Sequence, residues 1–182
     1  MHGNGSITRL ATVEARWFGD GPLPPALVDW FEAPGDVRVE DARTDRYVRL
    51  PGVEAVGVKQ RAGRFEIKAR RAGPTARVVW AGRTAPLERW LKWSAPLAAL
   101  GDDAVPPMDV DKRRRLRALP GVQVELAALE VAGLAAWTFG LEGAGAADVE
   151  AVLASGWAAA APVPAIAVAG GYPAWLDRLV DG

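Results

Sequence analysis

Basic residues near the middle of the chain have the spacing of an anion-binding surface. Alternate positions on both sides of a turn carry Lys59, Arg61, Lys68 and Arg70. A two-residue turn at Gly63-Arg64 places Lys59 directly opposite Lys68. Like charges that face each other across a strand pair destabilise it by roughly 0.2–1 kcal/mol, and a bound polyanion would remove that repulsion. The pattern predicts a phosphate-binding face, and a charged face that meets only solvent is the alternative.

A second basic run, Lys112-Arg113-Arg114-Arg115-Leu116-Arg117, lies in a predicted strand. Successive side chains of a strand point to opposite faces, so at most half of this run can reach one ligand. We expect Lys112 and Arg114 to join the binding face, together with Arg16 from the start of the chain. A nucleic-acid patch or an exposed edge is the alternative. The equal counts of 22 basic and 22 acidic residues and the lack of a basic recognition helix argue against duplex nucleic acid.

Three carboxylates, Glu14, Glu125 and Glu142, fall on the polar side of their predicted strands. If these strands surround one interior, the three would hold Mg²⁺ or Mn²⁺, which take oxygen ligands. A metal ion bridging phosphate oxygens would polarise phosphorus for attack by water. Isolated glutamates on strands are also common as plain surface residues, and this is the alternative.

Composition limits the remaining possibilities. The 182 residues are 50% hydrophobic and 24% charged, which is typical of one globular domain spanning residues 1–182. The chain has no cysteine and a single histidine, His2. The lack of cysteine excludes disulfides and thiolate metal sites. The position of His2 in the small, polar segment MHGNGS argues against a histidine-dependent triad. No signal-peptide pattern opens the sequence, and its longest apolar run is interrupted by two prolines. We expect a cytoplasmic protein without a membrane segment, and the abundance of arginine, alanine and glycine is typical of a bacterial one.

Alternation of apolar and polar residues predicts many strands, because side chains of an extended chain change face at every residue. The predicted strands cover residues 8–18, 37–50, a hairpin at 54–71, and 76–83, 86–93, 110–118, 122–131 and 134–142. Val58 and Ile67 lie on the apolar face of the hairpin, opposite its lysines. Helices are predicted from Pro24 to Glu32, over 146–154, and as a short segment at the C-terminus.

These elements predict an α+β fold that is mostly β, with a closed or nearly closed antiparallel barrel over residues 8–142 and a few peripheral helices. Residues 143–182 would form a helical and extended cover. The eight tryptophans are interpreted as core and cover residues. The alternation leaves two orientations open. In a sandwich the apolar faces meet in the core, whereas in a tunnel-type barrel the charged faces line the interior and helices cover the apolar outside.

The order of these motifs resembles the CYTH, or triphosphate tunnel metalloenzyme, superfamily between Thr12 and Glu142. The stretch from Thr12 to Arg16 is similar to its opening Glu-x-Glu-x-Lys strand, and TDRYVRLPG to its second strand and turn. Other matching elements are Lys59-Gln60-Arg61, Glu66-Ile67-Lys68, Lys112-Arg113-Arg114 and the closing hairpin VELAALEVAGLAAWTFGLEG, which retains Glu125 and Glu142.

The resemblance implies an eight-stranded antiparallel barrel whose tunnel binds a triphosphate or polyphosphate with Mg²⁺ or Mn²⁺. Members hydrolyse tripolyphosphate, thiamine triphosphate or RNA 5′ ends, or cyclise ATP. This sequence departs from the family where Thr12, Ala127 and Gly140 replace carboxylates. Our first hypothesis is therefore a metal-dependent triphosphate hydrolase acting on a small phosphorylated molecule. Alternatives are a non-catalytic phosphate- or nucleotide-binding module of the same fold, and a barrel or sandwich that binds an apolar ligand or a protein partner.

Overall fold

The computed structural model describes residues 8–48, 50, 52–61, 63–72, 76–96 and 107–181. Its longer strands are β1 (Thr8–Asp20), β3 (Arg43–Val48), β4 (Val56–Arg61), β5 (Arg64–Arg70), β7 (Arg83–Pro96), β8 (Pro107–Leu119), β9 (Val122–Val131) and β10 (Leu134–Gly143). The shorter strands are β2 (Arg38–Val39), β6 (Ala76–Trp80) and β11 (Val168–Ala169). The helices are α1 (Pro25–Glu32), α2 (Ala146–Leu153), α3 (Gly156–Ala159) and α4 (Tyr172–Asp181). Within the described ranges, none of these helices is long and apolar enough to cross a membrane.

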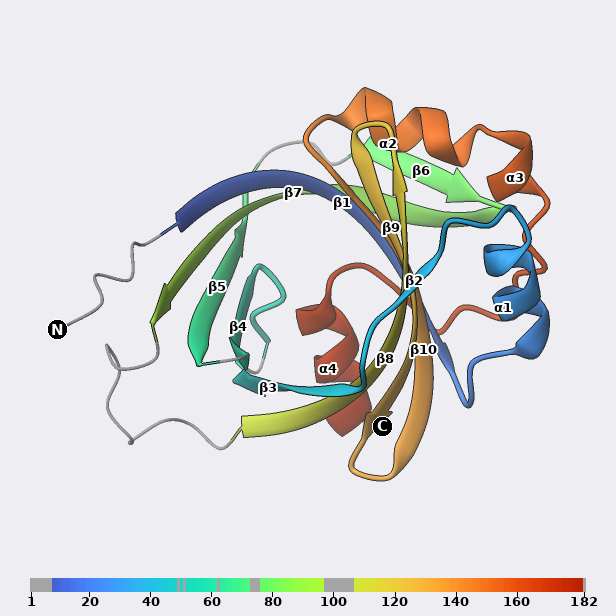
Figure 1. Ribbon diagram of the computed structural model, residues 1–182. Helices are drawn as coiled ribbons and strands as arrows, with labels where there is room; N and C mark the ends of the chain where they lie inside the picture. The colour runs from blue at the N-terminus through green and yellow to red at the C-terminus, as the bar shows by residue number, and fades with distance from the viewer. Residues whose placement is uncertain are drawn as a thin grey trace, which may run out of the picture.

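The eight longer strands form a closed antiparallel barrel. Neighbours follow the order β1-β10-β9-β8-β3-β4-β5-β7, and β7 pairs with β1 to complete the ring (Figure 1). The short strands β2, β6 and β11 pair with β8, β7 and β1 outside this ring. The predicted mostly-β fold and the closed antiparallel barrel are confirmed.

The polar faces of the barrel strands point inward, as in the tunnel-type orientation. The Lys59 side chain on β4 is only 18% exposed, so it faces the interior of the barrel. Ile67, on the other face of the same hairpin, is 37% exposed. The sandwich alternative is wrong for this chain, because it requires Val58 and Ile67 in the core and the lysines in open water.

The register of the β4–β5 hairpin differs from the prediction by two residues. Arg61 pairs with Arg64, and Lys59 therefore lies opposite Glu66 rather than Lys68. A shift of two residues keeps every side chain on its predicted face, because the strand repeat is two residues. The predicted Lys59–Lys68 pair is thus wrong, but Lys68 meets another like charge, since it lies directly opposite Lys92 of β7.

Two other strand boundaries also differ from the sequence prediction. The predicted strand at 37–50 is divided into β2 and β3. Val39 pairs with Arg115 and Arg43 with Lys112, so the β2–β3 side has one residue more than β8, which is the geometry of a β-bulge. The second difference is a tight turn at Ala81-Gly82, where both φ angles are positive (43° and 81°). This is typical of two-residue hairpin turns, and it lets β7 begin at Arg83 and run to Pro96.

The apolar outside of the barrel is covered by α1, α2 and α3 (Figure 1). Aromatic side chains fill this layer. Trp80 stacks on Phe139 with ring centroids 4.0 Å apart, and Trp30 of α1 stacks on Trp157 of α3 at 4.5 Å. Trp17, Trp80 and Trp137 belong to this core and Trp30 and Trp157 pack against it, as predicted. Trp90 and Trp93 lie in neither core cluster. Burial of several large aromatic rings on one side stabilises the strands that carry the inward charges.

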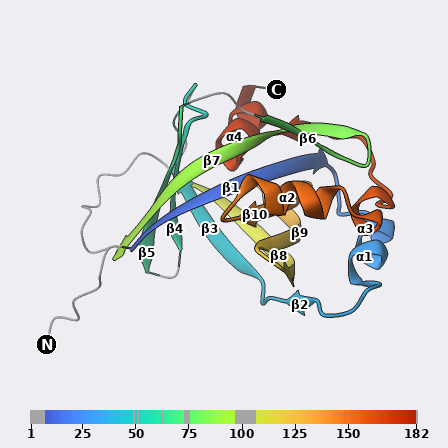
Figure 2. The ribbon, with the colours of Figure 1, turned by 90° about the horizontal axis from the view of Figure 1, so that it is seen from above.

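Helix α4 closes one end of the barrel, opposite the end where β2 lies (Figure 2). The inward face changes from charged to apolar along β1, from Glu14 and Arg16 to the buried Phe18. The Trp175 ring of α4 lies parallel to the Phe18 ring at a centroid distance of 4.9 Å. Arg178 of α4 forms an ion pair with Asp20 at 3.0 Å. The interior is therefore apolar where α4 enters it and charged beyond.

Replacing Trp175 with alanine tests this closure. We expect the free energy of unfolding to fall by about 3–5 kcal/mol, because the change removes a fully buried aromatic ring from the end of the barrel. Urea denaturation at pH 7 measures the loss. Val79→Ala on the exposed face of β6 is the control and should change stability by about 0.5 kcal/mol or less. Equal effects of the two variants would contradict the packing of α4 described here.

Candidate functional site

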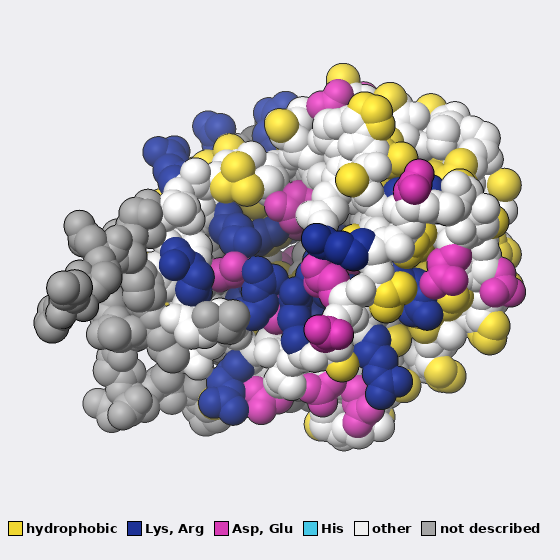
Figure 3. Space-filling view, viewed as in Figure 1, with side chains coloured by type: hydrophobic (Ala, Val, Ile, Leu, Met, Phe, Trp, Pro, Cys, Tyr) yellow, Lys and Arg dark blue, Asp and Glu magenta, His cyan; other side chains and the backbone are white. Residues whose placement is uncertain are grey.

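Charged side chains from the barrel strands line a cavity of about 410 Å³ inside the barrel. Its basic residues are Arg16, Arg38, Arg43, Lys59, Arg61, Lys68, Lys92, Lys112 and Arg114. Its acidic residues are Glu14, Glu40, Glu66, Glu125 and Glu142. We call this space the barrel cavity. The carboxylate of Asp45, which contacts three of these cations from behind the lining, is a sixth acidic group. Nine basic against six acidic side chains leave an excess of three positive charges, and Figure 3 shows Lys and Arg around the central hollow with Asp and Glu between them.

Most of the residues proposed from the sequence lie on the barrel cavity. Six of the seven predicted phosphate-binding residues line it: Arg16, Lys59, Arg61, Lys68, Lys112 and Arg114. The seventh, Arg70, is not part of the lining and forms an ion pair with Glu88 at 2.5 Å. The three predicted metal ligands, Glu14, Glu125 and Glu142, also line the cavity.

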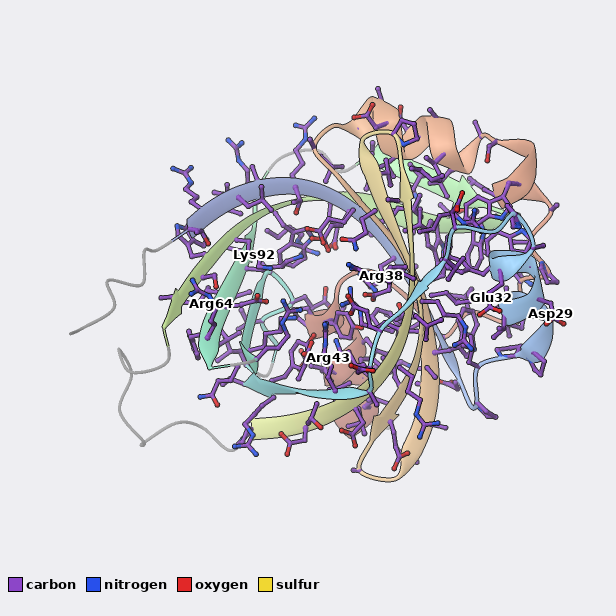
Figure 4. The ribbon with its side chains drawn as sticks, in the orientation of Figure 1. Asp29, Glu32, Arg38, Arg43, Arg64 and Lys92 are labelled. Atoms are coloured by element: carbon purple, nitrogen blue, oxygen red, sulfur yellow. The ribbon has the colours of Figure 1, made fainter. Side chains whose placement is uncertain are left out.

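Sequence reasoning missed three cations of the cavity, namely Arg38, Arg43 and Lys92. The alternation of the predicted strand 86–93 could have placed Lys92 on the face of Glu88. Arg38 and Arg43 belong to β2 and β3, where the bulge makes the alternation unreadable. Figure 4 shows Arg43 and Lys92 on opposite sides of the hollow, and this places cations on the strands of both walls.

The basic run of β8 divides between the two faces, as predicted for a strand. Lys112 and Arg114 point into the barrel cavity. On the outer face, Arg115 forms an ion pair with Glu32 of α1 at 2.6 Å. Arg117 Nη2 donates a hydrogen bond to the backbone oxygen of Phe31 at 2.6 Å. Half of the run therefore faces the cavity, while Arg115 and Arg117 attach α1 to the barrel.

Asp45 is the anion around which one wall of the cavity is organised. Its carboxylate is fully buried and lies 3.0 Å from Lys59 Nζ, 3.1 Å from Lys112 Nζ and 3.1 Å from Arg43 Nε. Burial alone would raise the pKa of Asp45, but Lys112 and Lys59 lower it by more, so the pKa lies well below its usual range. Sequence reasoning gave Asp45 no role, although the predicted strand 37–50 places it on the same face as Arg43 and Tyr47.

Lys112 is the most enclosed cation of the site, with a side chain that is 3% exposed. Its Nζ donates a hydrogen bond to the Tyr47 hydroxyl at 2.9 Å and lies 3.7 Å from the ring centroid of Tyr172. Burial, together with repulsion from Lys59, lowers the pKa of Lys112 well below its usual value despite the attraction of Asp45. The aromatic rings supply part of the compensation that water would give an exposed ammonium group.

Two further carboxylates each connect several cations. Glu66 lies 3.3 Å from Lys59, 3.2 Å from Lys92 and 3.7 Å from Arg61. Its partners come from two strands, Lys59 and Arg61 from β4 and Lys92 from β7. Glu40 similarly joins Arg38, Arg43 and Arg114, at 2.9, 3.3 and 2.6 Å. Lys59, Arg43 and Arg114 each contact two carboxylates, so these charges form one connected network rather than separate pairs.

Arg16 crosses Gly140 to reach Glu125. The register places Arg16 opposite Gly140 and Gly140 opposite Glu125 on three adjacent strands. A Cβ atom at position 140 would lie 2.6 Å from the Arg16 Cζ, so the guanidinium occupies the space of the missing side chain. Arg16 Nη1 then donates to Glu125 Oε1 at 2.7 Å, and Arg114 Nε donates to the other carboxylate oxygen. Both oxygens of Glu125 thus have arginine partners.

The register also brings three carboxylates side by side on adjacent strands. Glu14 lies opposite Glu88 of β7 and opposite Glu142 of β10. Lys68 Nζ contacts Glu14 directly and lies 3.5 Å from Glu142, while Arg70 neutralises Glu88. Glu88 is a buried carboxylate that sequence reasoning did not select, although it lies on the same face of β7 as Lys92.

These carboxylates do not have the arrangement of a metal centre. Across the described residues, no group of three acidic, histidine or cysteine side chains is placed to hold a metal ion. The oxygens of Glu125 and Glu14 point to arginine and lysine nitrogens instead. The residues present therefore do not fit the Mg²⁺ or Mn²⁺ implied by the resemblance, and we assign no step to such an ion.

Comparisons with known proteins identify no family for the chain. No protein-family model matches it, and no curated protein is similar to it. Among solved structures, the chain is similar to the Pct1 RNA triphosphatase of S. pombe, with 10% sequence identity and a TM-score of 0.43. The match covers 95% of this chain and 80% of that one. A likeness at this level carries no argument about function, so the function has to be inferred from the residues of the cavity.

Asp45→Asn tests the role of Asp45 as the shared anion of Lys59, Lys112 and Arg43. We expect the free energy of unfolding to fall by about 3–5 kcal/mol, because the change leaves buried cations without their counter-ion. Urea denaturation at pH 7 measures it. Asp109→Asn, which removes an exposed ion pair with Arg46, is the matched control and should change stability little. A loss no larger than the control's would contradict the role of Asp45.

Acid should unfold the protein through the carboxylates of the cavity. The pKa values of Asp45, Glu14, Glu66 and Glu125 are lowered in the folded state. Their contribution to stability is therefore fully present above the unfolded values of 3.8 for Asp and 4.5 for Glu and is lost as pH falls through the lower folded values. We expect the urea concentration at the midpoint of unfolding to stay constant from pH 7 to 5 and to fall steeply below pH 4.5. A midpoint that does not change down to pH 3 would refute this.

Proposed function

We propose that the barrel cavity binds the triphosphate or polyphosphate group of a small phosphorylated molecule. The single observation that carries the proposal is the excess of basic over acidic side chains around one cavity, nine against six when Asp45 is counted. Lys and Arg are the side chains that bind phosphate oxygens most strongly, Arg through its planar fork and Lys as a point charge. A polyphosphate is the ligand whose several charges match cations spread around a barrel wall.

Repulsion between cations inside the cavity also supports an anionic ligand. Lys68 and Lys92 lie directly opposite each other on β5 and β7, both inside the barrel, with side chains 24% and 23% exposed. Like charges in this position destabilise a strand pair. In the free protein Glu14 and Glu142 offset the charge of Lys68, and Glu66 offsets that of Lys92. An anion bound between the two lysines would offset both charges at once.

The shape and lining of the cavity favour a phosphate chain over the other ligand classes. An apolar ligand needs apolar walls, whereas this lining carries fourteen charged side chains. A volume of about 410 Å³ accommodates a small molecule and excludes duplex nucleic acid. Because α4 closes one end, a ligand would enter from the opposite end, where Arg38 and Glu40 lie near the short strand β2.

Tripolyphosphate should stabilise the protein against thermal unfolding, because a ligand bound only by the native state adds roughly 2.7 kcal/mol at a hundredfold excess over its Kd. Differential scanning fluorimetry and calorimetric titration measure the shift and the Kd, with citrate and sulfate as comparison anions. Lys92→Gln should weaken binding by roughly 10- to 150-fold, since one hydrogen bond to a charged group contributes about 1.5–3 kcal/mol.

Arg89→Gln is the matched control, because Arg89 is exposed and lies on the outer face of the same strand, β7. It should leave the Kd unchanged. Failure of tripolyphosphate to bind, or equal weakening by both variants, would refute the proposed function. Phosphate release from bound tripolyphosphate, ATP and thiamine triphosphate, measured with and without Mg²⁺ or Mn²⁺, decides whether hydrolysis follows binding.

A further inference from the structure

We infer that the barrel cavity binds polyphosphate without a divalent metal ion, and that its carboxylates are built-in counter-ions which the ligand displaces. This inference rests on the proposed function and specifies how the site operates. It concerns the six carboxylates that contact the cavity's cations: Glu14, Glu40, Asp45, Glu66, Glu125 and Glu142. Each of these carboxylates lies against lysine or arginine nitrogens of the cavity.

Every cation that lines the cavity has at least one of these carboxylates within 4 Å. Asp45, Glu40 and Glu66 contact three cations each. Carboxylates used in this way have their oxygens turned toward the wall and toward nitrogen atoms. A divalent ion needs several oxygens turned toward one point. The acidic residues are thus arranged as partners of the cations rather than as ligands around a common centre.

Glu125 shows this use most clearly. Arg16 and Arg114 bond to its two oxygens from opposite sides. The path of Arg16 across Gly140 depends on the absence of a side chain there, so a carboxylate at position 140 and the Arg16–Glu125 pair exclude each other. This chain has glycine at position 140 and forms the Arg16–Glu125 ion pair. This position is built to hold a guanidinium group, which is a phosphate donor.

The adjacent row of Glu88, Glu14 and Glu142 contains the strongest candidates for metal ligands, and basic side chains already lie against all three. Lys68 Nζ contacts both Glu14 and Glu142, and Arg70 contacts Glu88. Attraction from Lys68 and Arg16 outweighs burial and lowers the pKa of Glu14, so this carboxylate keeps its charge for the lysine. Lys68 holds a position between carboxylates that a divalent ion would otherwise take.

Binding by this arrangement is an exchange of ion pairs. Phosphate oxygens take the place of carboxylate oxygens on lysine and arginine nitrogens, and the carboxylates turn away. The carboxylates therefore compete with the ligand. Removing one carboxylate charge strengthens metal-free binding, whereas removing a metal ligand weakens metal-dependent binding. The two mechanisms predict opposite signs for the same substitution.

The first experiment measures the Kd of tripolyphosphate by calorimetric titration in buffer with EDTA and in buffer with Mg²⁺. We expect binding in EDTA that is at least as tight as in Mg²⁺, because Mg²⁺ only sequesters the free anion. Binding that is tenfold or more tighter with Mg²⁺ would overturn the inference and leave the proposed function intact. The absence of binding in both buffers would instead refute the proposed function.

The second experiment uses Glu142→Gln. Glu142 is the safest position to change, because its side chain is 31% exposed and its contact with Lys68 is 3.5 Å long. In EDTA we expect the variant to bind tripolyphosphate about two- to fivefold more tightly, the range that loss of one partly exposed ion pair corresponds to. Glu130→Gln, on an exposed position of β9, is the control and should not change the Kd. Weaker binding by Glu142→Gln would overturn the inference.

A third measurement reads metal binding directly. Mn²⁺ is titrated into the ligand-free protein, and the unbound ion is followed by electron paramagnetic resonance. We expect no saturable binding at millimolar protein and metal concentrations. Saturable binding of Mn²⁺ by the wild type that is lost in Glu142→Gln would show that the carboxylates are metal ligands, and would overturn the inference.

Discussion

Compensation of buried charge is the constraint on which the rest of this structure depends. Nine lysine and arginine side chains line one cavity, and all of them except Arg38 are largely removed from water. A charge removed from water is tolerated only where it is paired and hydrogen-bonded. The protein meets this requirement by sharing. Asp45, Glu40 and Glu66 each form ion pairs with three cations, including cations on neighbouring strands. The ion pairs therefore connect strands around the ring as well as neutralising them.

Such an interior cannot provide the hydrophobic driving force for folding, and the apolar packing lies elsewhere. One layer of it is outside the barrel, where Trp17, Trp80 and Phe139 pack beneath the covering helices. A second layer is at the end of the barrel that α4 closes, around Phe18 and Trp175. Apolar burial is roughly proportional to the area removed from water, so these two layers stabilise a scaffold whose centre remains polar. The same division leaves the charged half of the interior accessible from one side.

The alternation of side chains made much of the site predictable. It indicated the strands and the group of lysines and arginines that share a face in the hairpin, while two prolines and a helical spacing of apolar residues indicated the helix that ends at Glu32. It did not indicate Arg38 and Arg43, because the bulge before β3 interrupts the alternation, and it gave no role to Asp45. The family resemblance, in turn, implied that Gly140 replaces a carboxylate, whereas in the structure the Arg16 guanidinium occupies the space that a side chain at position 140 would fill.

The sequence by itself determined which residues belong together on each face of each strand, because the pleat has a period of two residues and is set by the local backbone. Only the tertiary structure decided that the charged face is the inner one, that Lys59 faces Glu66 and Lys68 faces Lys92, and that Glu125 is bound by two arginines. These facts depend on the closure of the ring and on pairings between residues far apart in the chain. A shift of two residues leaves the alternation unchanged, so no local pattern could distinguish one set of charge partners from another.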